Sequence, residues 1–102
     1  MYQLVIQFPL RNTYPSATEL DALVSLEDKL EHDANGAYEV DGHDAGAGEM
    51  NIFIITADAV ATFNQIEDKL PADLSWRAGF RDLDSGDYTP LAPVGLAAFE
   101  VQ

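Results

Sequence analysis

The chain has 102 residues, and its charge is strongly skewed, because 18 acidic side chains against 5 basic ones give a net charge of −13. A polyanionic surface repels nucleic acids and anionic membranes and attracts basic proteins. The absence of cysteine excludes disulfides, thiolate metal ligands and cysteine nucleophiles. We therefore expect one acidic domain, residues 1–102, that binds neither nucleic acid nor membrane.

We expect neither a signal peptide nor a membrane-spanning helix. The amino terminus has no basic start and no small-residue cleavage site. No apolar run approaches the ~20 residues that a membrane helix needs. Together with the lack of cysteine, these features predict a cytoplasmic protein.

The first two elements are a strand and a long helix. Alternating apolar side chains predict the strand over residues 2–8. Ser16 and Glu19 have the spacing of a capping box and predict the start of the helix. Asn35 and Gly36 predict its end, since both tolerate the left-handed backbone conformation. The apolar residues of the helix fall on one arc: Leu20, Leu23, Val24, Leu26 and Leu30.

Two further strands are predicted over residues 37–43 and 49–56, joined by a glycine-rich hairpin. The second of them is apolar on both faces and therefore belongs in the middle of a sheet. Asp58 can cap a second helix that Pro71 ends. A fourth strand is predicted over residues 76–81, where apolar and other residues alternate. The second helix carries this apolar stripe: Ala59, Phe63, Ile66 and Leu70.

The element order β-α-β-β-α-β predicts a ferredoxin-like two-layer sandwich of the α+β class. The pentads at residues 26–30 and 66–70 share Glu-Asp-Lys between apolar residues and support an internal repeat. Pro90 and Pro93 interrupt the C-terminal part of the chain. After them, residues 96–101 can form a short additional edge strand.

The hairpin segment concentrates titratable residues beside the most apolar strand: Asp41, His43, Asp44 and Glu49. Carboxylate and imidazole groups at this spacing could bind a divalent cation. The ligand set is incomplete, however, because the other histidine, His32, belongs to the first helix. A β-hairpin with positive-φ glycines explains the same pattern. We therefore expect no metal and no cofactor, and an exposed, mobile acidic tip that carries His43.

A second acidic segment contains Asp82, Asp84 and Asp87 and has the alternating carboxylates of a calcium loop. Gly86 comes one place too early for such a loop, and Pro93 stands at the twelfth position, where glutamate is required. An Asp-Ser-Gly turn between two segments explains the pattern as well.

Catalytic chemistry has little support in the sequence. His43 beside Asp41 and Asp44 is the best acid–base candidate, but no nucleophile motif accompanies it. An enzyme with His43 as base is the weaker alternative, and we assign no catalytic residue. Arg77 and Arg81 are expected to project from one face of the fourth strand. They would contact an anion on the open sheet face or, as we favour, pair with acidic strand residues such as Glu39 or Asp41.

The segment from Glu39 to Ile54 resembles a widespread set of small bacterial proteins of about this length. Their pattern is Leu-Glu-Asp-x-Leu in the first helix, matched by residues 26–30, and an Asp-Gly-His/Asn-Asp/Glu-x-Gly hairpin, matched by residues 40–46. The segments at 80–82 and 87–91 are also similar to that set. The resemblance implies a ferredoxin-like fold and no established activity, so it assigns no catalytic residue.

These features predict a non-enzymatic protein-interaction module whose acidic surface meets a basic protein. The sharpest version is a bacterial immunity protein that neutralises a basic toxin, an analogy that rests on size, charge and compartment. The alternative is a small-ligand or divalent-metal-binding domain centred on residues 41–49. Whether the protein forms a homodimer stays open. The predicted partner-binding residues are Asp41, His43, Asp44, Glu49, Asp82, Asp84 and Asp87.

Overall fold

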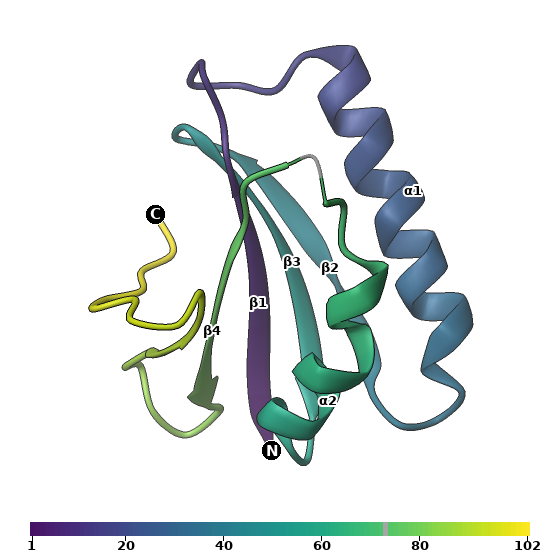
Figure 1. Cartoon of the computed structure of the whole chain (residues 1–102), viewed down its shortest axis with the longest axis vertical. Helices are drawn as coiled ribbons and strands as arrows, with labels where there is room; N and C mark the ends of the chain where they lie inside the picture. The colour runs from purple at the N-terminus through teal and green to yellow at the C-terminus, as the bar shows by residue number, and fades with distance from the viewer. Residues whose placement is uncertain (73) are drawn as a thin grey trace.

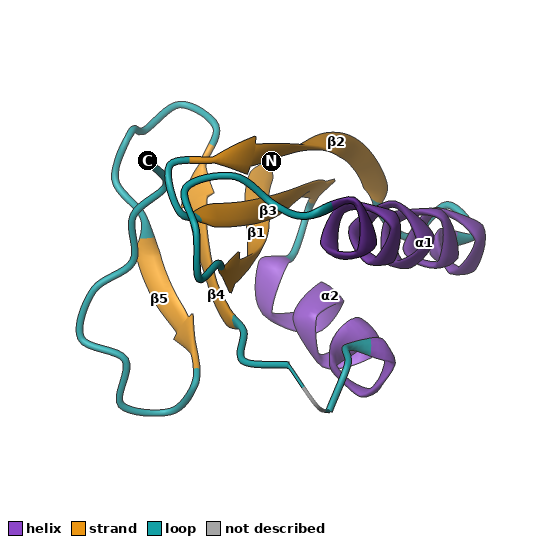
Figure 2. Ribbon diagram, turned by 90° about the horizontal axis from the view of Figure 1, so that it is seen from above, coloured by secondary structure: helices purple, strands orange, loops and turns teal. Residues whose placement is uncertain are grey.

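The computed structural model describes residues 1–72 and 74–102, and within them one five-stranded sheet carries two α-helices on one face (Figures 1 and 2). The strand order is β2-β3-β1-β4-β5, and every neighbouring pair is antiparallel. The protein therefore has an α+β fold. Its elements are β1 (Tyr2–Pro9), α1 (Ala17–Ala34), β2 (Glu39–Gly46), β3 (Glu49–Thr56), α2 (Ala59–Ile66), a 3-10 helix (Glu67–Lys69), β4 (Arg77–Asp82) and β5 (Thr89–Ala92).

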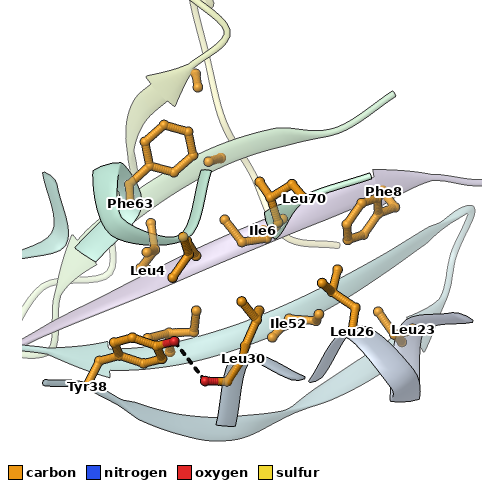
Figure 3. Packing of buried hydrophobic residues seen from close by; sticks show 14 of the residues in the cluster. Leu4, Ile6, Phe8, Leu23, Leu26, Leu30, Tyr38, Ile52, Phe63 and Leu70 are labelled. Carbon is orange, nitrogen blue, oxygen red and sulfur yellow. Dashed lines mark hydrogen bonds between the residues drawn. The ribbon is translucent and has the colours of Figure 1, made fainter. Parts of the chain in front are cut away.

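The core lies between the sheet and the two helices (Figure 3). Strand alternation turns Leu4 and Ile6 of β1 toward the helices, with Ile52 of β3 beside them in register. These three side chains are completely buried, and each contributes about 1.5–3 kcal/mol by leaving water. β3 lies between β1 and β2, so its predicted place in the interior of the sheet is confirmed.

Helix α1 begins as predicted. The Ser16 hydroxyl accepts a hydrogen bond from the Glu19 amide at 3.1 Å, and the Glu19 carboxylate accepts one from the Ser16 amide at 2.8 Å. Asn35 ends the helix with a left-handed φ of 47°. The predicted apolar arc is too wide, however, because Leu20 and Val24 remain 38% and 37% exposed. The residues that α1 buries are Leu23, Leu26, Leu30 and Ala34.

The second strand lies later in the chain than the predicted 37–43. β2 extends to Gly46, and the two-residue turn to β3 consists of Ala47 and Gly48, whose φ values are 54° and 82°. Asp41 is an extra residue in a β-bulge, because Val40 and Gly42 pair with consecutive residues of β3. Gly42, at φ 122°, serves this bulge and is not part of a loop.

The C-terminal part differs most from the prediction. α2 is capped by Asp58 as expected but ends at Ile66, where a 3-10 turn replaces the last α-helical turn. The predicted edge strand over residues 96–101 is wrong. The fifth strand is Thr89–Ala92, and Pro90 is tolerated there because β5 has a free edge. The chain then returns along the sheet face opposite the helices (Figure 2).

Candidate functional site

The four titratable residues of the predicted hairpin site do not converge. Strand alternation directs His43 toward α1, whereas Asp44 and Glu49 contact Asn51 on the opposite face of the sheet. Asp41 is exposed at the bulge. The prediction that an acidic hairpin tip carries His43 is therefore wrong. His43 lies within β2, and the turn consists of Ala47 and Gly48.

His43 connects the two layers of the fold. Its Nδ1 lies 2.9 Å and 3.0 Å from the two carboxylate oxygens of Glu27 on α1. An ion pair at the surface contributes about 0–1 kcal/mol when the imidazole is protonated. The contact links α1 to β2 and engages Nδ1 of the imidazole ring, which orients the ring.

A buried polar cluster lies on the sheet face opposite the helices. The Gln7 amide nitrogen donates to Glu49 Oε2 and to Asn51 Oδ1, both at 3.0 Å. The Asn51 amide nitrogen donates to Glu49 Oε2 at 2.9 Å and to Asp44 Oδ1 at 2.8 Å. Glu49 is only 5% exposed, and its oxygen is held by neutral donors. Among residues 1–72 and 74–102, no buried side-chain polar atom lacks a partner, so the cluster is internally satisfied.

The C-terminal residues cover this cluster. We call residues 96–102 the strap. The Glu100 carbonyl accepts a hydrogen bond from the Gln7 amide nitrogen at 2.9 Å, and the Gln102 amide donates to Glu49 Oε2 at 3.1 Å. The Phe99 ring rests directly on Gly79 of β4, where a Cβ atom would overlap it. Phe99 is consequently buried although the strap has no regular secondary structure.

The strap and the cluster were not among the features predicted from the sequence. A signal for the cluster was present, because Gln7 and Asn51 each interrupt an apolar strand and fall on the same face by alternation. No local pattern connects Phe99 to Gly79, which lie on separate segments of the chain. Their contact is a tertiary one that periodicity does not report.

Arg77 and Arg81 share a face as predicted, but their predicted pairing with Glu39 or Asp41 is wrong. Arg77 donates to the side-chain carbonyl of Gln7, and Arg81 donates to that of Gln3 at 3.0 Å. The sheet order explains the difference, because β1 and β3 separate β4 from β2. Both guanidinium groups are therefore directed to neutral side chains of β1.

The second acidic segment is a turn whose polar atoms serve the turn itself. Asp82 Oδ1 accepts from the Asp84 amide at 2.9 Å, and the Ser85 hydroxyl accepts from the Asp87 amide at 3.2 Å. This is the Asx-type pattern of a tight turn. In the described part of the chain, no group of three or more acidic, histidine or cysteine side chains is placed to hold a metal ion.

Exposed carboxylates remain on two packed elements, and we call them the acidic surface: Asp21, Asp28 and Glu31 of α1, with Glu39, Asp41 and Asp44 of β2. α1 and β2 contact each other through the His43–Glu27 pair and through Tyr38, which lies just before β2. Besides these acidic residues, α1 and β2 contain one lysine, Lys29. The electrostatic field around α1 and the edge strand β2 is therefore negative.

Tyr38 is held under the end of α1. Its hydroxyl donates to the Leu30 carbonyl at 2.7 Å (Figure 3). Burial raises the pKa of the Tyr38 hydroxyl above its ordinary value, and the neighbouring Asp33 carboxylate raises this pKa further. The tyrosine thus remains neutral and serves as a donor to the helix.

An apolar cleft of about 760 Å³ lies on the helix side, where α1, the end of β1 and the segment before β4 meet. Phe8, Leu23, Leu26 and Met50 form part of its wall, and Arg11 is among its polar residues. Small-molecule sites commonly have this size. Among the described residues that line the cleft, the one carboxylate is that of Glu19, and it is engaged in the helix cap.

No family model matches the chain, and neither a curated protein nor a solved structure matches it. Across residues 1–72 and 74–102, neither helix combines the length and the apolar character that crossing a membrane would require. The functional argument therefore rests on the residues of this chain.

Proposed function

We propose that the protein is a non-enzymatic interaction module whose acidic surface binds a basic protein. The observation that carries this proposal is the acidic surface itself, with its exposed carboxylates on α1 and β2. Two of the five basic side chains, Arg77 and Arg81, are directed to glutamine side chains and do not neutralise it. Complementary charge accelerates association and rejects wrong partners more than it adds affinity.

The sharpest form of the proposal is a cytoplasmic bacterial immunity protein that neutralises a basic toxin. Its support is the net charge of −13 on a small domain without cysteine. In this role the acidic side chains of β2 and of the 82–87 turn occupy the nucleic-acid-binding face of the toxin. A gene next to the one that encodes this protein is then expected to encode that toxin.

We also assign the fold to the ferredoxin-like class as part of this proposal. The support is the strand order β2-β3-β1-β4 with two helices on one face, to which β5 is added as an outer strand. The resemblance of the 39–54 segment to small bacterial proteins points in the same direction.

A metal-binding or ligand-binding domain centred on residues 41–49 remains the competing function. The separation of His43 from Glu49 by the sheet, described above, weighs against it. Isothermal titration with zinc, manganese and calcium distinguishes the two proposals. Measurable heat together with a thermal shift would favour the metal site, and their absence favours the interaction module.

The test of the interaction module uses paired charge variants of the full chain. Partner capture at low and high salt identifies the basic protein, and its affinity is then measured for each variant. Glu39→Gln with Asp41→Asn should weaken binding roughly tenfold, since each lost surface pair contributes up to about 1 kcal/mol. Glu67→Gln with Asp68→Asn removes the same charge next to α2 and should change the affinity by less than about twofold.

Asp84→Asn with Asp87→Asn tests the 82–87 turn in the same assay. A loss like that of the β2 pair would extend the interface to this turn. Capture of no basic protein, or binding that does not weaken with salt, would overturn the proposal.

A further inference from the structure

The strap is anchored by a single aromatic side chain. Phe99 rests on Gly79 of β4 and makes an edge-to-face contact with Tyr88, with ring centroids 5.5 Å apart. Gly79 provides the space for the ring, because any Cβ at this position would overlap it. The face opposite the helices therefore contains a seat for one aromatic ring.

The other anchors of the strap hold its backbone. Gln7 donates to the Glu100 carbonyl, and Glu49 accepts from the Gln102 amide. We call Gln7, Glu49 and Gly79 the slot. The slot contacts two backbone groups and one ring of the strap. These contacts do not depend on which copy of the chain supplies the strap.

The connection between β5 and the strap is loosely held. It consists of residues 93–95, which contain no helix or strand, and a backbone hydrogen bond joins the Leu96 amide at the start of the strap to the Pro93 carbonyl at 3.0 Å. Val94, an apolar residue, is fully exposed at this connection. A second copy lying against the connection would cover a side chain that the single chain leaves in water.

We propose that the slot of one copy binds the strap of a second copy, so that two chains exchange straps across a twofold axis. In a reciprocal exchange, each strap makes with the other copy the same contacts that it makes within its own chain. No additional binding site is needed. In a single chain the tethered strap competes at an effective concentration in the millimolar range, so exchange requires high protein concentration or a blocked slot. This inference concerns the face opposite the helices and does not depend on the acidic partner.

The test separates the slot from the strap in two full-length variants. Gly79→Val blocks the slot by placing a branched side chain where the ring lies, and Phe99→Ala removes the ring and leaves the space over Gly79 free. Each variant alone should be a monomer in analytical ultracentrifugation. Mixed together, they should form a one-to-one complex, because the strap of the first variant enters the slot of the second.

The matched control replaces the first variant by the double variant Gly79→Val with Phe99→Ala, which has neither slot nor ring. This mixture should stay monomeric. Far-UV circular dichroism verifies that each variant folds, and Gly79→Ala and Phe99→Leu replace any variant that does not.

Two outcomes would overturn the inference. One is the absence of a complex in the first mixture although both variants are folded at hundreds of micromolar. The other is a complex that forms equally well with the double variant, since it would place the contact elsewhere on the molecule.

Discussion

Tyr38 is the single residue whose ionisation the fold controls most clearly. Its hydroxyl must stay protonated to donate to the Leu30 carbonyl, and burial raises its pKa above the ordinary value near 10. A raised pKa of the folded state means that the stabilising contribution is complete below pH of about 10 and is lost as the pH rises through the folded-state pKa. Alkaline conditions should therefore weaken the attachment of α1.

The prediction compares Tyr38→Phe with the natural chain at pH 8 and at pH of about 11. At pH 8 the variant should be less stable by about 1 kcal/mol, because one buried hydrogen bond is lost. At the higher pH the difference in free energy of unfolding should shrink, since the natural chain then loses the contribution of its neutral tyrosine. Urea unfolding measures both values.

Tyr14 provides the control for this experiment, because its side chain is largely exposed. Tyr14→Phe should leave the pH dependence of the natural chain unchanged. Tyr38→Phe and the natural chain should differ in free energy of unfolding more at pH 8 than at the higher pH. An equal difference at both pH values would contradict the proposed role of the neutral tyrosine.

At the scale of elements, the polar cluster joins β1, β3 and the strap. Gln7→Leu removes the donor to Glu49, Asn51 and the Glu100 carbonyl, while the Glu49 carboxylate remains buried. The substitution should lower the free energy of unfolding by about 1–3 kcal/mol, the usual penalty for buried polar groups that lose their partners. Urea unfolding, followed by circular dichroism, measures the change.

Gln3→Leu is the matched control on the same strand and the same face. Gln3 accepts hydrogen bonds from Arg81 and Tyr88, but it is only half-buried, so water can replace some of what is lost. Its substitution should cost clearly less than that of Gln7. An equal or larger cost for Gln3→Leu would show that burial of the cluster is not what makes Gln7 important.

The elements that the sequence predicted well are those defined by local chemistry. The capping box at Ser16 and the left-handed Asn35 fixed the ends of α1, and the strand at 49–56 matches β3 to the residue. These features depend on neighbours within a few positions. Leu20 and Val24 were misplaced because helical spacing gives the direction of an apolar arc but not the width that the sheet can cover.

The elements that were predicted poorly depend on contacts between distant segments. The second strand was predicted to end at residue 43, whereas β2 continues to Gly46 and contains a bulge next to Gly42. An edge strand was expected where the strap lies, because alternation there resembles a strand although Phe99 faces Gly79. The same limit applied to the candidate site, since His43 and Glu49 are close in sequence and are separated by the sheet.

For the whole molecule, the dominant feature is self-repulsion. The net charge is −13, and the described residues form ion pairs only between His43 and Glu27 and between Lys69 and Asp68. Such a charge destabilises the compact state, and salt relieves the repulsion because the Debye length falls from about 30 Å at 0.01 M to about 3 Å at 1 M.

Sodium chloride should therefore stabilise the folded protein. Raising the ionic strength over this range should increase the free energy of unfolding by about 1 kcal/mol, which raises Tm by roughly 4–8 °C for a domain of this size. The less acidic variant with Glu39→Gln, Asp41→Asn, Glu67→Gln and Asp68→Asn should respond more weakly. A fall in Tm with salt would mean that attractive pairs outweigh the repulsion.

The chain contains one tryptophan, Trp76, which packs against the core and lies 5.8 Å from the Phe63 ring of α2, measured between ring centroids. It is therefore an optical probe built into the helix side of the sheet. Release of the strap on the other face should leave tryptophan emission almost unchanged, whereas loss of the core should shift it to longer wavelength. A single fluorescence spectrum can thus distinguish a chain that has opened from one that has unfolded.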